Sequence, residues 1–97
     1  MGVKHGREYE SIIVDMGRML EQVPTSYELF EMSFDDWKSL ESEEREACLK
    51  TLADDVFFGL GSDPEIELGL VRFHYKNEDH QIDIWFVNEK VGTVSLI

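Results

Sequence analysis

The chain has 97 residues, one cysteine and a formal net charge of −12, because 21 Asp and Glu stand against nine Lys and Arg. A hydrophobic fraction of 42% is typical of a folded protein rather than a disordered one. The length fits a single domain, 1–97, whose modest core disfavours a deep enclosed active site. The negative charge disfavours direct binding to nucleic-acid phosphates or to anionic membranes.

The first part of the chain predicts a long amphipathic helix. Residues 1–6 carry no periodic pattern, and we expect a loose leader there. From residue 7 onward, apolar side chains recur with the 3.6-residue period of a helix until Pro24 ends it. Gly17 in this helix is expected to allow a close helix crossing. The members of the apolar stripe are Tyr9, Ile12, Ile13, Met16, Met19, Leu20 and Val23.

The next segment predicts one or two short helices and a second long one. Ser33 precedes the acids Asp35 and Asp36, which is typical of a helix N-cap followed by an acidic first turn. Ser42 repeats this signal for a helix over about 43–58, before a glycine-rich end and Pro64. The buried stripe expected in this helix is Leu49, Leu52, Ala53, Val56, Phe57 and Leu60. Residues 7–61 therefore form the predicted helical layer.

After Pro64 the hydrophobic period changes from 3.6 to 2, which predicts strands over 65–76, 81–88 and 92–97. The turns at 77–80 and 89–91 are too short for parallel crossovers, so the strands should form an antiparallel meander over 65–97. In the first strand the apolar residues change parity near Gly69, which we interpret as a β-bulge. The predicted fold is α+β, with helices on one face of a three-stranded antiparallel sheet in the order ααβββ.

The strand register can be predicted from the apolar pattern. If Lys76 pairs with Gln81, one face of the sheet collects six large apolar side chains: Val71, Phe73, Tyr75, Ile82, Ile84 and Phe86. The same register places Arg72 opposite Trp85 on the outer face. Exposed Trp and Arg are enriched at interface hot spots, and the apolar residues expected beside them are Leu70 and Val87.

No catalytic or cofactor motif stands out in the sequence. His74 and Asp83 oppose one another in the predicted register and are interpreted as a surface pair; a metal site that also uses His80 is the alternative. Cys48 lies within a helix among acids, where a reactive thiolate is disfavoured. We therefore expect no catalytic residue, no cofactor and no metal.

The acids concentrate in the middle of the chain. From Glu28 to Glu67, thirteen carboxylates face three cations. A surface of this sign steers basic partners toward it, although it is also typical of a merely solubilising face. The partner-binding residues predicted are Asp35, Asp36, Glu43, Glu44 and Glu46 for steering, with Arg72 and Trp85 as anchors.

The leading hypothesis is a non-enzymatic protein-binding module that acts stoichiometrically on a protein with a basic surface, as a regulator, immunity-like inhibitor or acidic decoy. The first alternative is a homodimer formed through the outer sheet face or the uncharged last strand. The second is a small metal protein or enzyme using His74, His80 and Asp83. The single cysteine, the lack of an apolar run long enough for a membrane and the lack of a secretory signal favour a cytoplasmic location.

Overall fold

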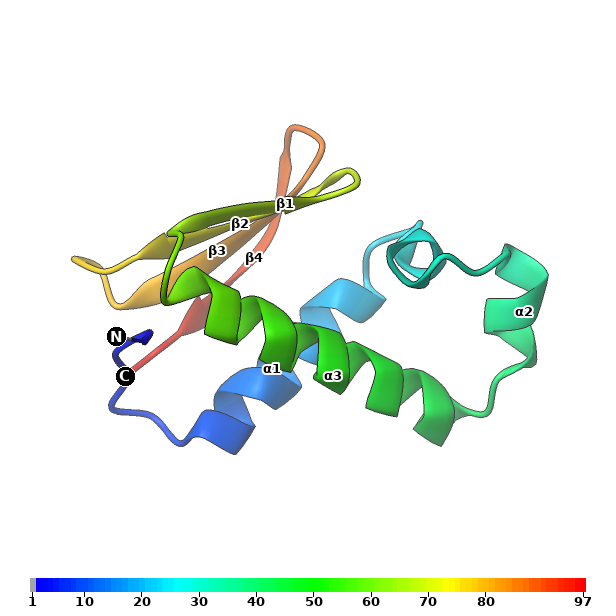
Figure 1. The fold of residues 1–97 in the computed structure, drawn as a ribbon, viewed down its shortest axis with the longest axis horizontal. Helices are drawn as coiled ribbons and strands as arrows, with labels where there is room; N and C mark the ends of the chain where they lie inside the picture. The colour runs from blue at the N-terminus through cyan, green and yellow to red at the C-terminus, as the bar shows by residue number, and fades with distance from the viewer. Residues whose placement is uncertain (1) are drawn as a thin grey trace.

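The computed structural model describes residues 2–97 (Figure 1). Helices come first, namely α1 (Tyr9–Glu21), the 3-10 helix η1 (Ser26–Phe30), α2 (Phe34–Ser39) and α3 (Ser42–Leu60). Four strands follow, namely β1 (Glu65–Leu68), β2 (Val71–Lys76), β3 (Gln81–Phe86) and β4 (Glu89–Ser95). The predicted α+β order, helices and then an antiparallel sheet, is confirmed, but the sheet has four strands and not three. None of the helices in 2–97 is long and apolar enough to cross a membrane.

The extra strand arises at Gly69. The strands pair in the order β1-β2-β3-β4, and Leu68 at the end of β1 is the partner of Val71 at the start of β2. A two-residue turn therefore replaces the predicted bulge, with Gly69 at a φ of 58°, as such turns require of one central residue. Because Leu68 and Val71 are partners, they share a face, which explains the change of apolar parity in the sequence.

The last turn also differs from the prediction. The hairpin of β3 and β4 turns at Val87 and Asn88, so residues 89–91, predicted as the turn, belong to β4. Val87 has a φ of 56°, a left-handed conformation that β-branched residues rarely adopt. The sheet does contain a β-bulge, but it lies between β3 and β4 and not at Gly69. The register of this pair shifts between Ile84 and Trp85.

The register of β2 and β3 is as predicted. Lys76 pairs with Gln81, and Arg72 pairs with Trp85. The six apolar side chains assigned to the inner face are buried or pack against the core. α1 lies against β4 and α3, and α3 lies against β1 and β2, so both long helices cover this one face (Figure 1).

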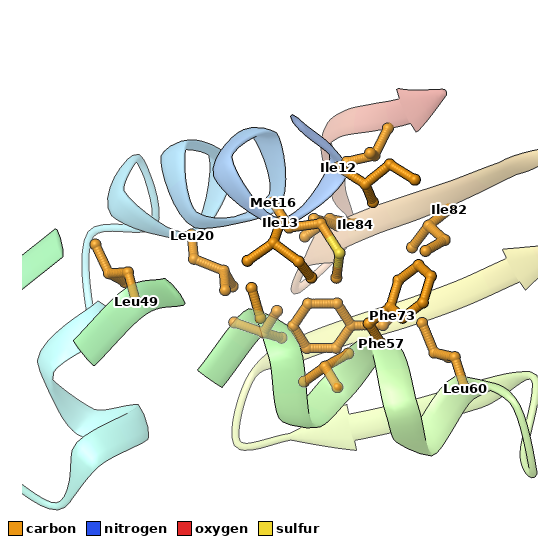
Figure 2. Packing of buried hydrophobic residues seen from close by; sticks show 14 of the residues in the cluster. Ile12, Ile13, Met16, Leu20, Leu49, Phe57, Leu60, Phe73, Ile82 and Ile84 are labelled. Carbon is orange, nitrogen blue, oxygen red and sulfur yellow. The ribbon is translucent and has the colours of Figure 1, made fainter. Parts of the chain in front are cut away.

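The core joins the helical stripes to the sheet. Figure 2 shows Ile12 and Met16 of α1 and Phe57 and Leu60 of α3 gathered around Phe73 of β2. Phe73 is fully buried, as are Ile82 and Ile84 of β3. The stripes predicted for the two long helices are mostly confirmed: Tyr9 is the member that remains exposed, whereas Met19 and Leu52 are half-buried.

The segment before α1 is tied to the end of the chain. Residue 1 of the expected leader lies outside the described residues. Within 2–6, Val3 is buried, and the backbone N–H of Gly6 donates to the Leu96 carbonyl at 2.8 Å. These contacts replace the loose leader expected there and place the two ends of the chain side by side (Figure 1).

Gly17 lies in α1 where this helix crosses α3, as expected. A Cβ added at Gly17 would stand 3.8 Å from the Leu49 Cβ, an ordinary van der Waals distance. Since alanine favours helix by about 1 kcal/mol over glycine, Gly17→Ala should raise the free energy of unfolding by up to that amount, measured by urea denaturation.

Gly92→Ala is the matched control. A Cβ at Gly92 would lie 2.9 Å from the Met19 Sδ, so the methionine would have to move and no gain is expected. A Gly17→Ala variant less stable than the wild type would contradict the packing described for α1 and α3.

Candidate protein-binding site

The segment from η1 to the first turns of α3, residues 26–46, forms an acidic arm. It contains eight carboxylates and two cations, so it carries −6 of the total −12. In Figure 1, α2 lies away from the sheet at one end of the molecule. Half of the net charge is therefore held in about a fifth of the chain.

The carboxylates of the acidic arm have no cation partners within the described residues. All eight are exposed, and none of them takes part in the ion pairs found within residues 2–97. The Arg45 guanidinium turns instead to the Leu40 carbonyl and, at 3.4 Å, to the Ser42 hydroxyl. The members are Glu28, Glu31, Asp35, Asp36, Glu41, Glu43, Glu44 and Glu46, which include all five residues predicted for steering.

Two aromatic pairs hold the acidic arm in shape. Phe30 stacks on Trp37 with ring centroids 5.2 Å apart and planes 9° apart. Tyr27 meets Phe34 edge to face at 5.6 Å. Trp37 is buried by this packing, whereas Phe34 remains 55% exposed beside Asp35 and Asp36. The arm thus presents an aromatic ring within a field of carboxylates, which can bind a cation through the ring face and the charges together.

Local capping explains how the acids are placed. The Ser33 hydroxyl accepts from the Asp36 backbone N–H at 3.1 Å, which confirms the predicted N-cap of α2. The cap of α3 differs from the prediction, because Glu41 and not Ser42 occupies this position. The Glu44 carboxylate accepts from the Glu41 N–H at 3.0 Å to complete a capping box. Glu44 therefore has a structural role in addition to its charge.

The two predicted anchors lie together on the outer sheet face, apart from the five acids. The Arg72 guanidinium is 5.5 Å from the centre of the Trp85 ring, and the Lys90 ammonium is 5.9 Å from it. Arg72 also faces Glu65 at 3.8 Å. Trp85 is half-buried rather than freely exposed. Both flanking cations thus cover the indole, which leaves less of it for a partner than the sequence suggested.

The burial of Asp83 is the feature of this face that the sequence did not predict, because Asp83 was expected to form a surface pair with His74. The Asp83 side chain is fully buried, although it lies on the outer face. One oxygen, Oδ1, accepts from the Thr93 hydroxyl at 2.8 Å and from the Gln81 amide at 2.9 Å. The other, Oδ2, accepts no well-directed hydrogen bond within residues 2–97 but lies 3.1 Å from the Lys76 ammonium. The Lys90 ammonium lies 3.3 Å from Oδ1.

The predicted pairing of His74 with Asp83 holds for the backbone only. The two residues are Cα partners, yet the ion pairs of Asp83 in the described chain are with the two lysines. The lysines stand diagonally to Asp83, and their long stems reach across the face to it. Desolvation by burial raises the pKa of Asp83, but the hydrogen bonds from Thr93 and the other donors outweigh it, so the pKa lies below its ordinary value of 3.8.

The alternative hypothesis is a metal site that uses His74, His80 and Asp83. Within residues 2–97 no three His, Cys, Asp or Glu side chains converge in a way that could hold a metal ion. A hollow of about 290 Å³ between α1 and α3 has a lining of Val14, Gly17, Arg18, Glu21, Glu46, Leu49 and Lys50, without a histidine or cysteine. His74, His80 and Asp83 therefore do not form one site in this structure.

Asp83→Asn should destabilise the protein, since it leaves Lys76 and Lys90 without their counter-charge. A loss of about 1–3 kcal/mol in the free energy of unfolding is expected at neutral pH. Because the pKa of Asp83 is lower in the folded chain than in the unfolded one, its stabilisation is complete above the unfolded pKa and fades as the pH falls through the folded pKa. The difference in the free energy of unfolding between Asp83→Asn and the wild type should therefore become smaller at acid pH.

Asp79→Asn, in the exposed turn between β2 and β3, is the control and should change stability by less than about 0.5 kcal/mol. Urea denaturation of the three proteins over a pH series makes the comparison. If the difference between Asp83→Asn and the wild type stayed constant into the acid range, Asp83 would not stabilise the fold as a carboxylate.

No model of a known protein family matches this chain, and no curated protein or solved structure matches it either.

Proposed function

We propose that this protein is a stoichiometric binding module whose acidic arm docks a protein with a basic surface, and that it acts by occupying that surface. The observation that carries the proposal is the set of eight exposed carboxylates without cation partners in the described chain. Outside the arm, Glu10, Asp15, Glu65 and Asp83 are matched by nearby cations. The nine acids there without an ion-pair partner in the described chain are spread over the other 76 residues, whereas the eight of the arm lie within 21.

The chemistry of the acidic arm supports steering followed by contact. Negative charge that no nearby cation neutralises accelerates the encounter with a positive partner and orients it. Phe34 and Tyr27 then offer ring surface for the stems and charged heads of Lys and Arg. The aromatic pairs fix the arm before binding, so little ordering cost is expected.

Dimerisation through the outer sheet face or the last strand is the second candidate function, after protein binding by the acidic arm. β4 is at an edge of the sheet, as that hypothesis requires. However, the N–H groups of Gly6 and Arg7 donate to the Leu96 carbonyl, and the Arg7 guanidinium donates to the Ser95 carbonyl at 3.1 Å. The first residues therefore cover one end of this edge and reduce the groups open to a second copy.

Charge reversal tests the proposed function. Glu43→Lys with Glu46→Lys changes two exposed acids of the arm and spares the capping box. Asp54→Lys with Asp55→Lys, farther along α3, changes the net charge equally and is the control. Binding of a fluorescein-labelled oligolysine peptide is followed by fluorescence anisotropy at low and high salt.

The arm variant should bind at least about fivefold more weakly than the control at low salt, and the difference should narrow as salt screens the charges. An equal loss in both variants would show that net charge, and not the arm, attracts the peptide.

A further inference from the structure

A crevice lies at the base of the acidic arm, between η1 and the turn that joins β1 to β2. It has a volume of about 170 Å³, and its lining is Thr25, Glu28, Leu29, Glu31, Leu68, Gly69, Leu70 and Val71. Pockets for drug-sized ligands are usually about 300 Å³ or larger. This crevice is therefore of a size to receive one side chain rather than a small-molecule ligand.

Part of the crevice lining is aliphatic. Leu29 and Leu68 are half-buried and pack against the core, while Leu70 is 57% exposed at the tip of the turn. Gly69 has no side chain, and a Cβ placed there would stand 4.0 Å from the Leu29 Cδ2. The glycine that makes the turn thus also leaves space beside Leu29.

The exposed apolar surface continues beyond the crevice. The Val87 N–H donates to the Leu70 carbonyl at 3.0 Å, which joins the two hairpin tips. Val87 is 55% exposed, and with Leu70 it lines a second hollow next to the first. Two exposed aliphatic side chains on adjoining tight turns are not needed for the core, and such a patch is typical of a contact surface.

The crevice lining also carries negative charge. Glu28 and Glu31 line the crevice, and both belong to the acidic arm. Neither has an ion-pair partner within the described residues. Since the lining combines aliphatic side chains with two unpaired carboxylates, the complementary ligand is an aliphatic side chain with cationic neighbours.

We propose that the crevice receives one aliphatic side chain of a lysine- or arginine-rich segment of the partner, while the flanking cations meet Glu28, Glu31 and the rest of the acidic arm. This inference rests on the proposed function and adds a sequence requirement to it. Charge alone would not distinguish one basic segment from another, whereas the crevice selects segments with a Leu, Ile or Val among the cations.

The test uses two fluorescein-labelled peptides that differ at one position, an oligolysine with a central leucine and the same peptide with a central serine. The full-length protein should bind the leucine peptide roughly tenfold more tightly, as expected for burial of one leucine side chain. In Leu70→Ser the two affinities should become nearly equal. In Phe58→Ser, which changes an exposed apolar residue outside the crevice lining, the ratio should persist.

The outcomes separate the two proposals. Equal, salt-sensitive binding of both peptides to the wild type would overturn the crevice and leave the acidic arm as the docking surface. No binding of either peptide would overturn both. If Leu70→Ser still bound the leucine peptide more tightly than the serine peptide, the leucine of the peptide would bind outside the crevice, and the crevice proposal would be overturned. Methyl NMR spectra of the wild type provide a check that needs no variant, since the leucine peptide alone should shift the Leu29 and Leu70 methyl signals.

Discussion

The structure depends on one packing contact, the burial of the α1 and α3 stripes against the inner face of the sheet around Phe73. Leu20 and Leu49 extend this contact toward the end where the acidic arm leaves the body. Because the two long helices provide most of the helical side of the core, the connection between them is free to project. That connection is where the sequence concentrates its unpaired carboxylates.

The outer sheet face and the acidic arm differ in how far their charges are paired. On the outer sheet face, each cation has a local counterpart: Arg72 lies near Glu65, and Lys76 and Lys90 lie over Asp83. On the acidic arm the cations are few, and Arg45 is used to bind backbone and hydroxyl oxygens. Satisfied charges stabilise a fold, whereas unsatisfied exposed charges are available to another molecule. The arm is therefore favoured over the sheet face as the docking surface.

Much of the fold could be predicted from the sequence because local rules and burial agree there. The 3.6-residue stripes identified α1 and α3, and the period-2 pattern fixed the register of β2 and β3. The two tight turns escaped prediction for different reasons. At Gly69 the change of apolar parity fits either a bulge or a tight turn, and the bulge was the wrong choice. Val87 adopts a conformation that its side chain disfavours. The burial of Asp83 was not predicted because its partners lie on both neighbouring strands, which the pattern of one strand does not reveal. The crevice was not predicted because its lining comes from residues 25–31 and 68–71, which are distant in sequence.

The central claim is that the acidic arm is the surface that meets a basic partner. Amide chemical-shift perturbation of the isotopically labelled wild-type protein, titrated with an oligolysine peptide, tests it most directly. The account predicts that the largest shifts fall within residues 26–46 and at the adjoining turn around Gly69, while α1 and the outer sheet face shift little. Shifts spread evenly over all exposed acids, or centred on Arg72 and Trp85, would contradict it.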